Sequence, residues 1–221
     1  MKKNILLVVV LFATSVVTFV GCSKEEVIDS EDTGLSTLTI SGRLEKDTAK
    51  VEVFADNGGD KYDRYKGRLG MYEVTRKTFS ITVREPNPAI LTLVRGQYPP
   101  TVAVSDVEAK CIWASVFADG RSISKLSASL ATESYIYVDR DVTVSGIYSE
   151  FSESEDLPEG ENSDDGNFNF ILSTTITIDV QLKKGWNILV ETMVPTTEGE
   201  LMSEIKVGSI KDGKWTSDWG Q

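Results

Sequence analysis

The chain of 221 residues contains no histidine and only two cysteines, Cys22 and Cys111. Without histidine it cannot form a Ser-His-Asp or Cys-His catalytic arrangement or a histidine zinc site, and it lacks the commonest general base near neutral pH. Two cysteines cannot build a thiolate metal cluster. Cys111 lies in the apolar run 111–117, so we expect it to be a buried small hydrophobic side chain and not a reactive thiol.

Basic residues are also scarce, because 23 lysines and arginines face 34 acidic residues and give a net charge of −11. Removal of residues 1–21 would take away Lys2 and Lys3 and leave 21 basic residues and a net charge of −13. A nucleic-acid-binding protein shows a basic stripe, and an anionic membrane surface repels an acidic body. We therefore expect no nucleic-acid partner.

The first 21 residues have the order of a secretory signal peptide. Lys2 and Lys3 precede an apolar run over residues 5–20, and the small residue Gly21 stands directly before Cys22. The run has about 16 residues, whereas a helix that spans a bilayer needs about 20. The sequence therefore predicts a cleaved signal peptide and not a transmembrane helix.

Residues 19–22, FVGC, resemble the lipobox of bacterial lipoproteins, with Phe19 where the family usually has leucine. Residues 23–26, SKEE, resemble the export signal of Bacteroidota surface lipoproteins. The resemblance implies that Cys22 becomes the first residue of the mature chain and carries acyl chains such as palmitate, each methylene adding about 0.8 kcal/mol of membrane affinity. It also implies a lipid-anchored protein on the outer-membrane cell surface, with an export signal formed by Lys24, Glu25 and Glu26.

Alternating apolar and polar residues dominate the rest of the chain, and no stretch has the three-and-four spacing of an amphipathic helix. This pattern predicts an all-β, antiparallel β-sandwich. We predict strands over residues 35–41, 51–54, 69–74, 78–83, 90–94, 102–107, 111–117, 135–138, 141–145, 168–172, 174–182, 186–193 and 204–207.

About a dozen strands exceed a single seven-strand sandwich, so the chain forms either two packed β units or one enlarged sandwich. Residues 22–34 are acidic and polar and are predicted to be a flexible tether. For two units, we assign residues 35–107 to an N-terminal β unit and residues 108–221 to a C-terminal β unit with an acidic loop at 149–166.

Residues 135–146 and 182–187 resemble a pattern in uncharacterised surface lipoproteins of Bacteroidota and spirochaetes. The resemblance covers about the last half of the chain and implies a β domain without activity. Gly185 permits a tight turn here, and Trp186 begins the following strand with a large side chain that we expect to be buried.

Eight carboxylates lie between residues 150 and 165 without a basic residue among them. They could form a calcium loop, with ligands that would include Asp156, Asp164 and Asp165, or a solvated loop. The aspartate at every second position that wraps a calcium ion is missing. We therefore favour the solvated loop and expect no metal and no cofactor.

Trp215 and Trp219 lie in a polar C-terminal stretch. Their rings are either exposed faces on which a sugar could stack or caps on the end of the core. Trp113 and Trp186 lie in apolar strands, where we expect core residues.

The sequence favours a lipid-anchored cell-surface β-sandwich protein with a non-catalytic binding or structural role. One alternative is a glycan-binding lipoprotein that uses exposed tryptophans, and another is an envelope or fimbria-like assembly subunit. A glycosidase needs only two carboxylates, and some pair among 34 acidic residues always meets that need. Carboxylates are thus no sign of catalysis, and we expect a glycan or protein ligand and no enzyme.

Overall fold

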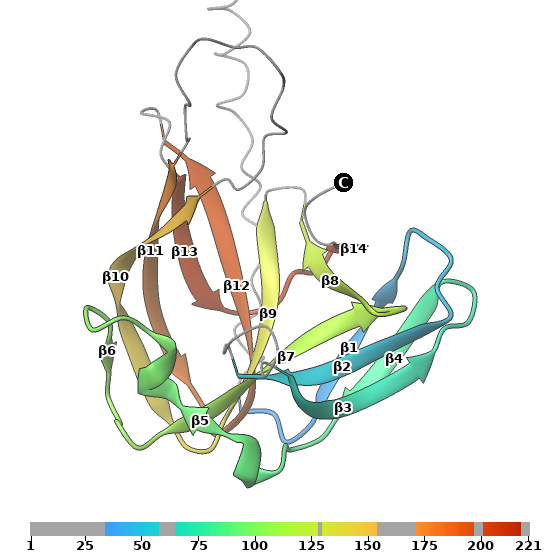
Figure 1. The fold of residues 1–221 in the computed structure, drawn as a ribbon, viewed down its shortest axis with the longest axis horizontal. Helices are drawn as coiled ribbons and strands as arrows, with labels where there is room; N and C mark the ends of the chain where they lie inside the picture. The colour runs from blue at the N-terminus through green and yellow to red at the C-terminus, as the bar shows by residue number, and fades with distance from the viewer. Residues whose placement is uncertain (1–33, 58–64, 128–129, 154–170, 197–200, 218–221) are drawn as a thin grey trace, which may run out of the picture.

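The computed structural model describes residues 34–57, 65–127, 130–153, 171–196 and 201–217, and 66% of them lie in strands (Figure 1). The predicted all-β, sandwich-like fold is confirmed. The elements are β1 (Leu38–Arg43), β2 (Lys50–Asp56), β3 (Tyr65–Glu73), β4 (Thr78–Val83), η2 (Pro88–Ile90), β5 (Thr92–Leu93), η3 (Val94–Gln97), β6 (Ala103–Val104), β7 (Lys110–Ala118), β8 (Arg121–Leu126), β9 (Ala131–Val138), β10 (Val142–Glu153), β11 (Ile171–Leu182), β12 (Gly185–Pro195), β13 (Leu201–Val207) and β14 (Lys214–Ser217).

Two sheets form the fold. The small sheet pairs β1 with β4, and the large sheet runs in the order β3-β2-β7-β8-β9-β12-β13-β11-β10-β6, with β14 added to β8 and β5 added to β7. In Figure 1 the small sheet covers one face of the β2–β3 region, while β9 to β13 curve away as a second wall. Neighbouring strands are antiparallel except β11 and β13, which are parallel.

Two main hydrophobic clusters fill the fold. The first joins Leu38 and Val53 to Ile112 and Trp186, so it draws side chains from both sides of residue 108. The second lies against the opposite face of the large sheet and contains Cys111 together with apolar residues of β9 to β12. The boundary that we predicted at residues 107/108 therefore does not separate two cores.

Side chains of β12 alternate between these two clusters. Trp186 and Ile188 of β12 lie in the first cluster, whereas Leu189 lies in the second. Tyr135 and Tyr137 of β9 stand directly opposite Ile188 and Trp186 and cover the same face. The burial of Cys111 and Trp186 is confirmed, since both are fully buried.

Gly185 has the role predicted for it at the turn between β11 and β12. Its φ of +111° is unfavourable for other residues, and a Cβ there would lie 2.7 Å from the carbonyl oxygen of Leu35. That close approach lets Leu35 exchange two backbone hydrogen bonds with Trp186, at 2.9 and 2.8 Å. The chain before β1 is thus fixed to the start of β12.

Some predicted strands were wrong. Residues 90–94 contribute only to the two-residue β5 between two 3-10 turns, because Pro88 begins η2 and the Asn87 side chain caps it. Residues 171–172 and 174–182 belong to one strand, β11, while residues 168–170 lie outside the described part of the chain. The strand predicted at 102–107 shrinks to β6. The sequence analysis missed β8 and β14, which have few apolar residues.

Residues 1–33 lie outside the described part of the chain, and with them the predicted signal peptide and tether. Among the described residues, no helix is both long and apolar enough to cross a membrane.

Candidate functional site

The large sheet opens where β7, β8 and β9 meet. The β7–β9 ladder ends at the pair Ala114–Tyr135, the β7–β8 ladder begins at Val116–Ile123, and the β8–β9 ladder is confined to Lys125–Glu133 and Leu126–Thr132. One serine of each strand therefore lies between the ends of two ladders. These are Ser115, Ser124 and Ser134.

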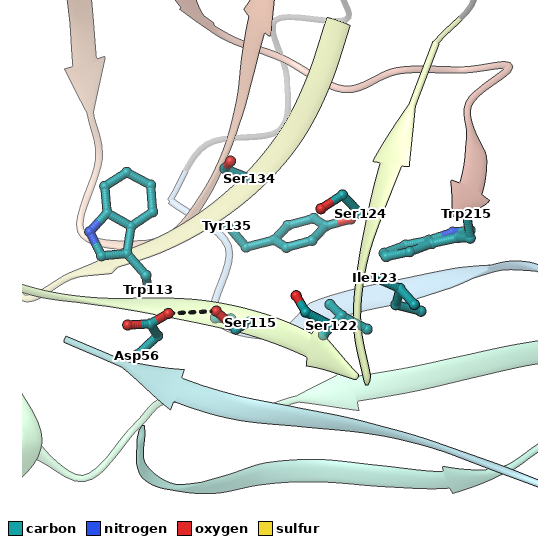
Figure 2. Close-up of a pocket in the computed structure, with 11 residues that line it drawn as sticks. Asp56, Trp113, Ser115, Ser122, Ile123, Ser124, Ser134, Tyr135 and Trp215 are labelled. Carbon is teal, nitrogen blue, oxygen red and sulfur yellow. Dashed lines mark hydrogen bonds between the residues drawn. The ribbon is translucent and has the colours of Figure 1, made fainter. Parts of the chain in front are cut away.

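This opening is a cleft of about 250 Å³, which we call the junction cleft. Figure 2 shows the three serines around it, with the Tyr135 ring extending from β9 towards β8. Trp113 lies at one side of the view and Trp215 at the other. The cleft thus combines hydroxyl groups with aromatic walls.

Hydrogen-bonding groups in the junction cleft come from four strands. Asp56 of β2 is 2% exposed, and its carboxylate accepts a hydrogen bond of 2.7 Å from the Ser115 hydroxyl. The Ser122 and Ser134 side chains make no hydrogen bond with any described residue. Trp113 is half-buried, so part of its indole remains accessible. A bound molecule could use the free hydroxyls and the indole together.

A buried carboxylate holds this junction in shape. Glu133 accepts hydrogen bonds from the Tyr135 hydroxyl at 2.6 Å, from Lys125 Nζ at 2.8 Å and from the Ile210 amide at 2.8 Å. Burial, and then the nearby Glu133 charge, raise the pKa of Tyr135 well above its usual value, so its phenol stays protonated. Lys125 thus forms an ion pair with Glu133, with only 17% of the lysine side chain exposed.

The arrangement offers hydrogen-bonding groups, and none of its serines lies beside a histidine. A serine nucleophile needs an adjacent general base, and the sequence has no histidine to supply it. Burial raises the pKa of the Cys111 thiol to about 12, which keeps it protonated. Within the described ranges, no three histidine, cysteine, aspartate or glutamate residues gather closely enough to hold a metal ion.

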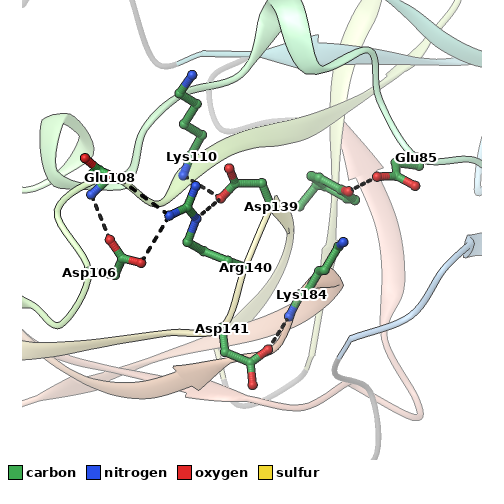
Figure 3. Close-up of polar contacts among 9 residues, drawn as sticks. Glu85, Asp106, Glu108, Lys110, Asp139, Arg140, Asp141 and Lys184 are labelled. Carbon is green, nitrogen blue, oxygen red and sulfur yellow. Dashed lines mark hydrogen bonds and ion pairs between the residues drawn. The ribbon is translucent and has the colours of Figure 1, made fainter.

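A second polar cluster, at the turn between β9 and β10, is structural (Figure 3). Arg140 forms ion pairs with Asp106, Glu108 and Asp139. Asp141 accepts the Lys184 amide at 2.9 Å, and this bond, followed by Lys183, lowers the pKa of the Asp141 carboxyl. Because these charges tie neighbouring loops together, the cluster fixes the end of the sandwich.

Trp215 differs from the exposed residue that one of our alternatives required. Its ring is 2% exposed, and its Nε1–H donates to the Ser41 carbonyl at 3.1 Å. It packs edge-on against Phe79, with ring centroids 5.3 Å apart. The alternative in which Trp215 offers an exposed stacking face is therefore wrong, whereas the alternative in which it caps the core fits its burial.

Trp113 was wrongly expected to be a full core residue, and the sequence analysis missed it as a candidate. Period two places Trp113 on the same face of β7 as the polar Ser115, whereas Ile112, Ala114 and Val116 face the first cluster. The polar Ser115 on that face was the signal in the sequence that Trp113 is not fully buried. The other predicted site residues lie outside the described part of the chain; they are Cys22, Lys24, Glu25, Glu26, Asp156, Asp164, Asp165 and Trp219.

Comparison of the chain with protein-family models, with curated proteins and with solved structures finds no match.

Proposed function

We propose that the protein is a lipid-anchored, non-catalytic surface protein that binds a small neutral polar ligand, such as a sugar unit of an extracellular glycan, in the junction cleft. The observation that carries the proposal is the half-buried Trp113 on the same cleft as the Asp56 carboxylate and the Ser122 and Ser134 hydroxyls, which bond to no described residue. A sugar presents an apolar face to an indole and hydroxyl groups to polar side chains. The cleft offers both kinds of surface.

The place of the protein in the cell follows from its N-terminal sequence. Residues 19–26 support acylation at Cys22 and display on the outer-membrane surface, as in the lipoproteins that they resemble. Several acyl chains hold a folded domain on a membrane without a spanning helix. The anchored domain would then meet ligands outside the cell.

Anchoring is tested by the substitution Cys22→Ala in the full chain. The variant should take up no radiolabelled palmitate and should move to the aqueous phase on detergent phase separation, because the apolar run of residues 5–20 is too short to span a bilayer stably. Ser23→Ala is the matched control and should behave like the unchanged chain. Normal palmitate labelling of the Cys22→Ala variant would refute the proposed anchor.

Ligand binding is tested on a glycan array and then by calorimetry with the best glycan. Trp113→Ala should weaken binding at least about tenfold, since aromatic anchors often contribute 2 kcal/mol or more. Tyr72→Ala removes an exposed aromatic ring from β3, outside the cleft, and should leave affinity unchanged. Absence of glycan binding, or an equal loss in both variants, would refute the cleft as the site.

The free edge of β10 supports a second candidate, a subunit of an envelope assembly. Among the described residues, β6 pairs only with Val144 and Ser145 of β10, and Ile147 beyond them is 60% exposed. An unpaired edge can accept a strand of another molecule. Ordered oligomers of the full chain that dissociate in an Ile147→Lys variant would favour this candidate, whereas monomers at all concentrations would refute it.

A further inference from the structure

Two adjoining hollows lie beside Leu44 and Glu45, which line both of them, and we call them together the basic-rimmed groove. The first hollow, about 390 Å³, lies between residues 44–48 and the turn at Asp119. The second hollow, about 400 Å³, extends towards Gly213 and Lys214.

The floor of the groove is apolar. Leu44 and Ile123 are buried core residues, and Ala118 and Trp215 complete the wall of the first hollow. Trp215 does not offer an open aromatic face, because its indole lies against β1 and a Cβ at Gly42 would be 2.1 Å from Nε1. The floor therefore suits an aliphatic side chain better than a stacked sugar ring.

The rim carries cations that lack partners, although the chain is strongly acidic. Some lysines elsewhere pair with carboxylates, as in the Lys125–Glu133 and Lys183–Asp141 ion pairs. Four exposed side chains of the groove make no hydrogen bond or ion pair with any described residue; they are Arg43, Lys46, Arg121 and Lys214.

The rim also has three acidic side chains, and two of them have partners. Asp119 accepts hydrogen bonds from the amides of Ala49 and Lys50, at 3.0 Å each for the shortest contacts. Asp47 forms an ion pair of 3.5 Å with Lys77, whereas the exposed Glu45 side chain pairs with no described residue. Lys77 and the four unpaired cations outnumber these three carboxylates, so the groove has a net positive charge around an apolar floor.

We propose that the basic-rimmed groove is a docking site for an acidic peptide segment of a partner protein. Carboxylates of the segment would pair with Lys46 and Arg121 at one end and with Arg43 and Lys214 at the other, and one aliphatic side chain would rest on Leu44 and Ile123. Charge complementarity between a basic rim and an acidic strand would give the contact its orientation and its fast association. This role is independent of the junction cleft and of its ligand.

The test is fluorescence anisotropy with the full chain in detergent and labelled peptides of equal length. A glutamate-rich peptide with a central leucine should bind, its leucine-to-alanine counterpart should bind several-fold more weakly, and a lysine-rich peptide should not bind. Binding of the first peptide should weaken as salt is raised. An oligogalacturonate of similar charge tests whether an acidic glycan is the ligand instead.

Charge reversal identifies the site. Lys46→Glu combined with Arg121→Glu should weaken peptide binding at least about tenfold. The matched control, Lys110→Glu with Lys184→Glu, makes the same change in net charge. Lys110 begins β7, whereas the groove lies at Asp119, just after the other end of this strand. The affinity of the control variant for the peptide should therefore stay within about twofold. If the reversed variant has a lower melting temperature, Lys46→Gln with Arg121→Gln replaces it and should still weaken binding.

Three results would overturn the proposal. They are equal losses in the reversed and control variants, tight binding of the oligogalacturonate without binding of the acidic peptide, and failure of every acidic peptide to bind at low salt.

Discussion

Truncating Trp186 to alanine tests how the two sheets are held together. The side chain is fully buried in the first cluster, where its ring meets Tyr137 edge-on with centroids 5.6 Å apart. Its Nε1–H also donates to the Arg84 carbonyl at 3.2 Å, just after β4. One residue of β12 thus contacts β9 and the chain that leaves the small sheet.

The expected cost follows from these contacts. Truncation of a buried tryptophan removes its transfer energy and leaves a cavity, together about 3–5 kcal/mol. Loss of the hydrogen bond to Arg84 lowers the free energy of unfolding by about 1 kcal/mol. Since domains are typically stable by about 5–15 kcal/mol, we expect Trp186→Ala to lower the melting temperature by about 10 °C or to unfold the chain.

Urea denaturation followed by circular dichroism measures the effect. Trp186→Phe keeps a ring against Tyr137 but lacks the indole N–H, so it should cost about 1–2 kcal/mol. Tyr72→Ala, at an exposed site on β3, should change stability by less than about 0.5 kcal/mol. A loss below about 1 kcal/mol for Trp186→Ala would refute the packing argument and the register of β12 against β9.

Two further predictions concern the acidic segment and the buried thiol. Calcium should not raise the melting temperature of the chain, and replacing residues 154–165 with a Gly-Ser linker should change the melting temperature little. A calcium-dependent rise that the replacement abolishes would mean that Asp156, Asp164 or Asp165 binds the ion. Burial raises the pKa of Cys111 from 9 to about 12, so its contribution to stability is complete below pH 9 and is lost as the pH rises from 9 to 12. Urea denaturation at several pH values between 9 and 12 should therefore show a smaller fall in the free energy of unfolding for Cys111→Ala than for the unchanged chain. An equal fall in both proteins would contradict the buried thiol.

Sequence alone predicts the strands whose pattern is strict. Residues 78–83 alternate between exposed and buried positions without interruption, and β4 has the predicted bounds. The segment RSISKL of β8 has no such pattern, because only Ile123 faces the first cluster and the remaining positions are half-buried or exposed. Its strand conformation depends on pairing with β7, β9 and β14, which local propensity does not encode.

The junction cleft could not be predicted for a related reason. It exists because three ladders end around one point, and each ladder joins segments that are separate in sequence. Period two places Trp113 and Ser115 on one face of β7, but it does not say that Ser124 and Ser134 come to the same place. The parallel pairing of β11 with β13 inside an otherwise antiparallel sheet is equally invisible to local patterns.

Trp215 shows how a short terminal strand can shape both candidate binding sites. The sequence places this indole between Lys214 and Thr216, which suggested exposure, but β14 pairs with β8 and turns the Trp215 side chain inward while Lys214 stays exposed. Gly42 leaves room for the ring on one side, and Phe79 packs against it on the other. Because the same indole lines the junction cleft and the first hollow of the basic-rimmed groove, the walls of both sites depend on the pairing of β14 with β8.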